Sequence, residues 1–412
     1  MTTQAVIIGG SHAGVQLCAS LRQNGWTGQI LMISDEPGLP YHRPPLSKGY
    51  LSGQAARTDL LIRSSDFYEK QRIDRSFAQV KEIDRQSHRI ILADGREVVY
   101  DKLALCLGAR PRPLVVPGAD LAGVHYLRTT SDIEAIKDEL AGVVHVVIVG
   151  AGYIGLELAA SLRALGIAVT VLETADRVLQ RVTAPQVSEF YARVHREEGV
   201  QIRTGIIITA LEGSVEKNRV RGVRCADGEL IEAGLVIVGI GVQPNVELAQ
   251  AAGLVVDNGI LIDAHGCTSD PDIVAAGDCA NHFSSLYGRR IRLESVPNAI
   301  EHAKVAAATL CGKPGQISAL PWFWSDQFDL KLQIAGLNAG HDKVVVRGNY
   351  QSGRSFSCFY FNNDRLIAAD CVNRAQEFLL SKRLIAEKVL IDSEMLADER
   401  FSMESLLTKG QS

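Results

Sequence analysis

The sequence predicts an α/β protein with two Rossmann-like dinucleotide-binding domains and a C-terminal α+β domain. Two observations support the paired domains. An apolar stretch, a glycine-rich turn and a helical pattern follow one another twice, with Gly9 and Gly150 at corresponding positions 141 residues apart. The third domain is indicated beyond about residue 318, where the pattern changes to the alternating apolar and polar residues of β-hairpins.

Composition sets the outer limits of this prediction. The chain has 412 residues, 46% of them hydrophobic and 22% charged, which is typical of a folded protein of about three domains. Lys and Arg number 43 against 47 Asp and Glu, so the net charge of −4 argues against a nucleic-acid partner. No apolar run reaches the ~18 residues of a membrane span, and the first ten residues lead directly into a strand with no signal-peptide pattern.

The first repeat begins with a strand at Ala5–Ile8 and continues into a helix that ends near Asn24. Its turn departs from the dinucleotide-binding pattern, because Ser11 takes the place of the middle glycine, where a side chain crowds a phosphate. We therefore expect a slightly displaced backbone with binding retained. After the next strand, Gln29–Ile33, Asp35 and Glu36 are in position to bind a ribose. The alternative is that this motif is an ordinary strand–helix turn. The candidate residues of the first repeat are Gly9, Ser11, His12, Ala13 and Gly14 in the glycine loop and Asp35 after the second strand.

The second repeat matches the pattern fully. A strand at Val146–Val149 leads into Gly-x-Gly-x-x-Gly, then a helix over Leu156–Leu165 and a strand over Ala168–Leu172. Glu173 follows that strand, and an acid there accepts hydrogen bonds from a ribose 2′-hydroxyl and repels a 2′-phosphate, which favours NADH over NADPH. Arg177 is the nearby cation that could offset this preference. The candidate residues are Gly150, Gly152, Tyr153, Ile154, Gly155 and Glu173.

Two dinucleotide sites in one chain suggest one fixed flavin and one exchanging nicotinamide. Asp278 follows a predicted strand at Ile273–Ala275, where a carboxylate can hold a flavin's ribityl hydroxyls or simply cap a turn. A helix beginning near Pro297 either directs its positive end at the flavin or lies on the surface. Lys48 could tune the flavin, with Glu157 as its natural partner, or be a plain solvated lysine.

Tryptophan and cysteine usage narrows the chemistry. Trp322 and Trp324 are expected on one face of a strand, by default in a core, or else towards the flavin or a partner protein. The eight cysteines include no CxxC pair, so a metal site or redox disulfide of that spacing is excluded. Buried thiols in a reducing cytoplasm are the expectation.

Six segments in fixed order carry a family resemblance: YHRPPLSK, GAGYIGLELA, GIGVQPN, TSDPDIVAAGDC, ESVPNA and PWFWSDQ. The sequence resembles the FAD-dependent ferredoxin reductases of oxygenase systems over about residues 5–375. The resemblance implies a glutathione-reductase-type fold: an FAD domain split between 1–110 and 240–317, an NAD domain at 111–239, and a C-terminal domain at 318–412. Two departures are Ser11 and the Cys106-Leu107-Gly108 run, where the family more often has Ala-Thr-Gly.

The resemblance also assigns residues to the cofactors. It implies FAD contacts at Ala13, Asp35, Arg43, Lys48, Val80, Arg128, Asp278 and Val296. Ala109 and Gly241 are further candidates for cofactor binding. It matches Gly150–Gly155 and Glu173 to the NADH site, Glu157 to an acid near the nicotinamide and Trp324 to a tryptophan near the flavin edge. Lys48 and Glu157 are the candidate catalytic residues, and no residue is assigned to a metal.

The implied activity is hydride transfer from NADH to FAD, followed by single-electron transfer to a 2Fe–2S ferredoxin that feeds a haem-thiolate monooxygenase. A disulfide reductase is excluded because it needs a closely spaced cysteine pair beside the flavin. Two alternatives stay open: a reductase for a rubredoxin or a Rieske-type ferredoxin, and an NADH-binding flavoprotein of the apoptosis-inducing-factor type. No nucleic acid or membrane is expected as a partner.

Overall fold

The structure is a computed structural model that describes residues 3–214, 218–313 and 315–409. The chain forms two compact units, each assembled from separate segments. The first unit comprises Met1–His42, Arg57–Arg110 and Val242–Ala319, and the second comprises Arg43–Ala56, Pro111–Gly241 and Leu320–Ser412. The division into domains at residues 110, 239 and 317 stays a prediction.

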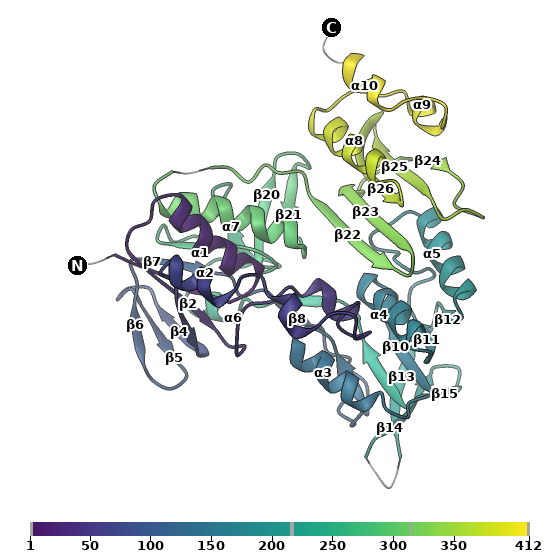
Figure 1. The fold of residues 1–412 in the computed structure, drawn as a ribbon, viewed down its shortest axis with the longest axis horizontal. Coiled ribbons are helices and arrows are strands. Elements are labelled where there is room, and N and C mark those ends of the chain that lie inside the picture. The colour runs from purple at the N-terminus through teal and green to yellow at the C-terminus, as the bar shows by residue number, and fades with distance from the viewer. Residues whose placement is uncertain (1–2, 215–217, 314, 410–412) are drawn as a thin grey trace. The chain divides into compact units, whose positions relative to one another are not determined.

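The first unit is built on a parallel five-stranded sheet in the order β19-β7-β1-β2-β3. Alternate residues of β1 enter two different cores: Ala5 and Ile7 pack with one apolar cluster, and Val6 and Ile8 with the other. Burial on both faces explains why the strand is continuously apolar. Helices α1 and α7 lie side by side on one face (Figure 1). The strands are β1 (Gln4–Ile8), β2 (Gln29–Ser34), β3 (Asp74–Phe77), β7 (Lys102–Leu105) and β19 (Ile273–Ala275), and the helices are α1 (His12–Gln23) and α7 (Val296–Leu310).

The second unit repeats this plan. Its parallel sheet has the order β12-β11-β10-β16-β9, so the strand that precedes the glycine turn is again central and its βαβ neighbour lies beside it. Helix α4 starts directly after Gly152, three residues earlier than the predicted Leu156, because the turn itself supplies the helix N-cap. The elements are β9 (Val124–Tyr126), β10 (His145–Val149), β11 (Ala168–Leu172), β12 (Val200–Arg203), β16 (Leu235–Val238), α3 (Thr130–Glu139), α4 (Tyr153–Ala164) and α5 (Pro185–Glu197).

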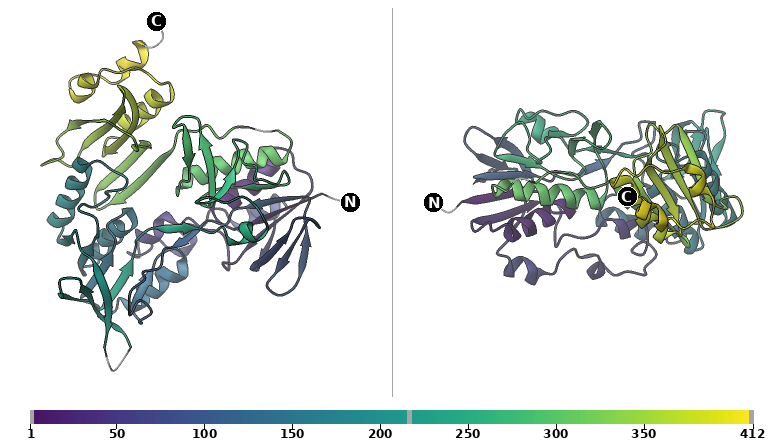
Figure 2. Two further views of the ribbon diagram at one scale, coloured as in Figure 1. Left: turned by 180° about the vertical axis from the view of Figure 1, so that it is seen from behind. Right: turned by 90° about the horizontal axis from the view of Figure 1, so that it is seen from above.

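An antiparallel sheet forms the C-terminal part of the second unit, in the order β22-β23-β26-β25-β24. Helix α8 packs on β23 and β26, and the yellow C-terminal helices are visible from all three directions (Figures 1 and 2). This part has the predicted α+β character. Its elements are β22 (Trp322–Gln327), β23 (Leu330–Gly336), β24 (Lys343–Gly348), β25 (Phe356–Asn362), β26 (Arg365–Val372), α8 (Ala375–Ala386), α9 (Ser393–Ala397) and α10 (Glu404–Lys409).

Smaller elements complete both units. The remaining ones are β4 (Val80–Asp84), β5 (Arg89–Leu92), β6 (Glu97–Val99), β8 (Ala109–Pro111), β13 (Ile208–Gly213), β14 (Val220–Cys225), β15 (Leu230–Glu232), β17 (Val242–Pro244), β18 (Ile260–Ile262), β20 (Ala280–Ser284), β21 (Arg289–Ile291), α2 (Ser65–Lys70), α6 (Glu247–Ala251) and the 3₁₀ turns η1 (Pro44–Ser47) and η2 (Arg57–Leu60). Within the described residues, no helix has both the length and the apolar character that crossing a bilayer requires. All eight cysteines are free thiols.

Candidate functional site

The first glycine loop joins β1 to α1, and its geometry requires glycine at both ends. Gly9 has φ +115°, and a Cβ added to it would lie 2.1 Å from the carbonyl oxygen of Cys106, which follows β7. A Cβ on Gly14 would lie 1.9 Å from the carbonyl oxygen of Gly9. Helix α1 therefore packs directly onto the turn before it, as a dinucleotide loop requires.

Ser11 occupies the N-cap of α1 in extended conformation, at φ −120°. This backbone region is open to any residue, so the serine is accommodated without strain at the position of the middle glycine. Its side chain makes no capping hydrogen bond to the helix. The first turn of α1 thus has no side-chain cap from this residue, and a helix N-terminus in that state binds anions such as a pyrophosphate.

The second glycine loop joins β10 to α4 and has the same design. Gly150 has φ +107°, and its added Cβ would lie 2.4 Å from the carbonyl oxygen of Gly239; that of Gly155 would lie 2.1 Å from the carbonyl oxygen of Gly150. Gly152, the N-cap of α4, has no atom within 4 Å of an added Cβ. The loop is therefore closely packed at its ends and open in the middle, which fits a nicotinamide dinucleotide whose pyrophosphate approaches the backbone there.

Each repeat places an acid directly after the second strand of its βαβ unit. Glu173 follows β11, and its carboxylate is held by two backbone groups: Ala151 N donates to Oε2 at 2.8 Å and Ala175 N to Oε1 at 2.9 Å. Ala151 belongs to the glycine loop itself, so the acid is fixed at the edge of the open cradle. Asp35 follows β2 in the first unit and is exposed.

Arg177 is the cation that could have offset the preference of Glu173 for NADH, but its guanidinium is hydrogen-bonded to other residues of the protein. Its guanidinium donates to the carbonyl oxygen of Thr183 at 2.9 Å, to Ser188 Oγ at 2.5 Å and to the carbonyl oxygen of Gln180 at 3.1 Å. These bonds fix the loop between β11 and α5. A guanidinium held in this way is poorly placed to bind a 2′-phosphate.

The other candidates of the first unit lie on separate elements. Ser295 caps α7 by accepting a hydrogen bond from Asn298 N at 3.3 Å, which places Pro297 in the first turn as predicted. His12 and His42 are hydrogen-bonded through Nε2 and Nδ1 at 3.0 Å. Val80 begins β4, Ala109 begins β8, Asp278 lies in the turn between β19 and β20, Val296 begins α7 and Ala13 is buried in α1.

Lys48 and Glu157 are in direct contact in the second unit. Lys48 Nζ lies 2.8 Å from Glu157 Oε2, and the glutamate side chain is 5% exposed. The paired prolines at the start of η1 form the turn that ends at Lys48. Ser161 Oγ of α4 donates to the carbonyl oxygen of Ser47 at 2.7 Å and ties the turn to the helix that carries Glu157. Lys48 is therefore a partnered cation with a side chain 20% exposed.

Two serines that the sequence analysis did not single out complete the surroundings of Glu157. Ser47 Oγ donates to Oε2 at 2.6 Å, and Ser325 Oγ donates to Oε1 at 2.6 Å. With Lys48, the carboxylate has three donors, one of them charged, and both of its oxygens are held in place. Single serines carry no spacing signal, and only the packing of η1 and β22 against α4 reveals them.

The remaining candidates of the second unit form smaller groups. Arg43 donates to the backbone carbonyl of Arg128 at 2.6 Å. Trp322 and Trp324 lie on one face of β22 with ring centroids 5.6 Å apart, as predicted. Tyr153 packs on Phe323 at 4.8 Å, and burial raises its pKa well above the usual value. Ile154 is exposed on α4, and Gly241 has φ +99° after β16.

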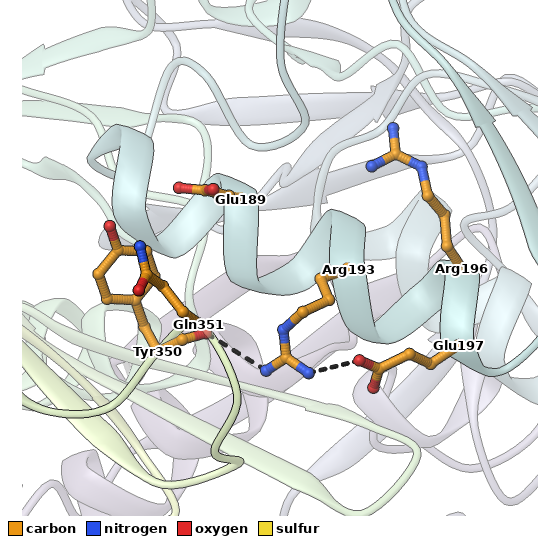
Figure 3. A pocket seen from close by; sticks show the side chains of 6 residues that line it. All are labelled: Glu189, Arg193, Arg196, Glu197, Tyr350 and Gln351. Atoms are coloured by element: carbon orange, nitrogen blue, oxygen red, sulfur yellow. Dashed lines mark hydrogen bonds and ion pairs between the residues drawn. The ribbon is translucent and has the colours of Figure 1, made fainter.

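A groove of the second unit is lined by other residues. It runs between α5 and the turn after β24 and is lined by Glu189, Arg193, Arg196, Glu197, Tyr350 and Gln351 (Figure 3). Arg193 is held there by Glu197 at 2.6 Å and by the carbonyl oxygens of Gly353 and Tyr350 at 2.6 and 3.2 Å. No predicted site residue lines this groove. The contacts of Arg193 connect helix α5 to the turn after β24.

Comparison with known proteins agrees with this geometry. Residues 3–306 match the family described as pyridine nucleotide-disulphide oxidoreductase, and residues 322–407 match the family described as reductase C-terminal. The chain is 46% identical to putidaredoxin reductase of Pseudomonas putida over 410 residues, which is 98% of this chain and 97% of that protein.

Solved structures show the same similarity in three dimensions. The reductase in the covalent putidaredoxin reductase–putidaredoxin complex superposes with a TM-score of 0.96 at 45% identity, covering 100% of this chain and 99% of that one. The ferredoxin reductase for the CYP199A2 system of Rhodopseudomonas palustris superposes with a TM-score of 0.94 at 42% identity, covering 98% and 99% of the two chains.

Proposed function

This chain belongs to the pyridine nucleotide-disulphide oxidoreductase family, and we propose that it supplies electrons to a putidaredoxin-like 2Fe–2S ferredoxin of a haem-thiolate monooxygenase system. The resemblance to ferredoxin reductases is confirmed, and with it the α/β fold class. The chain is an oxidoreductase that uses FAD and NADH. One observation carries the proposal: both glycine loops meet the steric demands of a dinucleotide site, in a chain that has no CxxC pair for disulfide chemistry.

The division of work between cofactor and protein follows from this. FAD, when bound, accepts a two-electron hydride and releases electrons one at a time. The first loop, with Asp35 and Asp278, fits the role of holding the adenosine and ribityl parts of that group. The second loop and Glu173 fit the exchanging nicotinamide, and Glu173 selects the 2′-hydroxyl of NADH.

We propose that Lys48 and Glu157 act as a pair during hydride transfer. The Glu157 carboxylate is buried and receives three donors, so its position is fixed and its charge is matched by Lys48 Nζ. A fixed cation of this kind can stabilise negative charge that develops on the reduced ring, and the carboxylate can orient the hydride donor. Arg43 donates a hydrogen bond to the backbone of Arg128, and we propose that both residues contact FAD.

Replacing Lys48 by Met tests this pair. The variant keeps the aliphatic length and removes the charge that balances the buried carboxylate. We therefore expect NADH-dependent flavin reduction to slow by about 100-fold or more, since loss of one preorganised charge costs ~2.7–4 kcal/mol. Stopped-flow absorbance under anaerobic conditions measures the step. The matched control is Lys304→Met, an exposed lysine of α7. An unaltered rate in Lys48→Met would return this residue to a structural role.

The acceptor is tested by anaerobic titration. NADH should bleach the flavin absorbance of the purified protein, and a 2Fe–2S ferredoxin added next should restore it and become reduced. Preferential reduction of a rubredoxin or a Rieske-type ferredoxin would replace the proposed partner, and bleaching with no protein acceptor would favour a flavoprotein that acts through contacts. A colourless preparation that keeps no adenine dinucleotide would refute the proposal. The cytoplasm is the proposed location, consistent with eight free thiols.

A further inference from the structure

A line of buried polar side chains extends from Glu157 into the second unit. Ser325 Oγ lies 2.6 Å from Glu157 Oε1, Gln327 Nε2 lies 3.1 Å from Ser325 Oγ, and His195 Nε2 lies 2.8 Å from Gln327 Oε1. The side chains come from α4, β22 and α5. Ser325 and His195 are fully buried and Gln327 is 1% exposed. These four polar groups are therefore linked to one another by hydrogen bonds, and within the described residues the Nδ1 atom of His195 has no hydrogen-bond partner.

The strand register explains why these side chains meet. Residues two apart on a strand share a face, so Ser325 and Gln327 lie on the face of β22 that also carries Phe323. Phe323 contacts Tyr153 of α4, which shows that this face is turned towards the helix of Glu157. The two tryptophans of β22 take the opposite face.

The Glu157 carboxylate, which forms an ion pair with Lys48, determines the direction of every hydrogen bond in the line. A carboxylate only accepts, so Ser325 must donate its proton to Glu157. Its oxygen must then accept from the Gln327 amide nitrogen, which turns the amide oxygen towards His195. That oxygen only accepts, so His195 must carry its proton on Nε2. Burial lowers the pKa of His195 to about 4, which keeps the ring neutral at neutral pH.

We propose that Ser325, Gln327 and His195 are positioning residues that hold the Glu157 carboxylate in its working orientation. The line ends at the imidazole ring of His195. This ring packs against Phe328 at a centroid distance of 5.0 Å, which restricts its movement. Lys48 and Ser47 hold the Oε2 atom of Glu157. The line of Ser325, Gln327 and His195, here called the relay, holds the Oε1 atom. The inference rests on the proposed role of Glu157 in hydride transfer.

Serine variants test the position of the carboxylate. Ser325→Ala removes the donor to Oε1, and we expect the limiting rate of flavin reduction to fall about tenfold while the dissociation constant of NADH changes less than about twofold. Ser325→Thr keeps the hydroxyl and should recover most of the rate. The matched control is Ser357→Ala, an equally buried serine of β25 in the same sheet, which should behave as the wild type.

The histidine provides a readout that does not depend on turnover. The ¹⁵N chemical shifts of labelled histidine, with His195→Gln for assignment, should show a neutral ring protonated on Nε2. In Glu157→Gln the carboxamide can donate to Ser325, so the hydrogen bonds are free to reverse, and the His195 signals should shift towards the Nδ1-protonated form. An Nδ1-protonated ring in the wild type would overturn the inference.

The two proposals fail in different ways. If Glu157→Ala slows flavin reduction but Ser325→Ala keeps the wild-type rate, the relay is refuted and the role of Glu157 stands. If Glu157→Ala itself keeps the wild-type rate, that role is refuted, and with it the positioning role of the relay. A slow Ser325→Ala enzyme that Ser325→Thr does not rescue, or a Ser357→Ala control equally slow, would show a general packing effect and would also refute the relay.

Discussion

The two glycine loops differ most where the nucleotide would lie and least where the protein packs on itself. Gly9 and Gly150 both have positive φ, and Gly14 and Gly155 both face the carbonyl oxygen of the first glycine. The middle position, by contrast, is Ser11 in the first loop and Gly152 in the second. The packing requirements of a strand–turn–helix unit are therefore strict, and the middle position is free to vary with the ligand.

The first residue of each helix extends the comparison. His12 starts α1 and pairs with His42, with ring centroids 5.1 Å apart and tilted by 49°. Tyr153 starts α4 and packs on Phe323 at 4.8 Å with a tilt of 44°. The ring geometry is nearly the same, but one pair is polar and titratable and the other is mostly apolar. The same structural position thus carries different chemistry in the two units.

The largest effect is expected at the third glycine of each loop. Gly14→Ala and Gly155→Ala each force a helix away from its turn, at a cost of about 1–3 kcal/mol or more. Gly14→Ala should lose most of its flavin, measured by absorbance, whereas Gly155→Ala should stay yellow with a KM for NADH raised at least about tenfold. Gly315→Ala, which has open space around its added Cβ, is the control. Loss of flavin from both variants would refute the assignment of FAD to the first loop and NADH to the second.

The second largest effect is expected on the choice between NADH and NADPH, and only from a change beside the second loop. Glu173→Ala removes the acceptor for the ribose hydroxyl and the repulsion of a 2′-phosphate. The ratio of kcat/KM for NADPH over NADH should rise about tenfold, corresponding to the ~1.5 kcal/mol of one charged hydrogen bond. Asp176→Ala, an exposed acid in the same turn, should leave the ratio unchanged. A constant ratio in Glu173→Ala would remove this residue from coenzyme selection.

A smaller effect is expected from making the middle positions alike. Gly152→Ser reproduces the first loop in the second, and the open space at Gly152 accommodates the new side chain within the protein. Thermal unfolding should therefore be unchanged, and the KM for NADH should rise only about threefold, or less than 1 kcal/mol. The converse variant, Ser11→Gly, should keep its flavin. A large loss of stability in Gly152→Ser would show that the protein itself, and not the ligand, requires glycine there.

The smallest effect concerns pH. Burial, and then the charge of Arg63, lower the pKa of His42 in the folded protein. The unfolded chain therefore takes up the proton first, and stability falls as pH drops below the usual histidine value of about 6.5. His42→Phe should make the decrease in melting temperature between pH 7 and pH 5 shallower. Tyr153→Phe, the matched change in the second unit, should keep the wild-type slope, and an equally steep slope in His42→Phe would exclude this histidine as a source.

Local sequence patterns were sufficient for much of the fold. The strand β19 and the two βαβ units could be predicted because apolar periodicity and glycine spacing act over a few residues. The start of α4 was misplaced by three residues because the N-cap is a glycine with no side-chain signal. Ser47, Ser325, Gln327 and His195 escaped notice for a different reason, since each is an ordinary polar residue until the fold brings it to Glu157.

The sequence alone determined that this protein has two nucleotide loops, an acid after each and no closely spaced cysteine pair, because those properties depend on residue identity and short spacing. Only the tertiary structure decided which polar residues share a buried site. Glu157 meets Lys48 across 109 positions and Ser325 across 168, and such long-range contacts depend on how α4, η1 and β22 pack. The direction of the hydrogen bonds from His195 to Glu157 follows from that packing and from the charge of a single carboxylate.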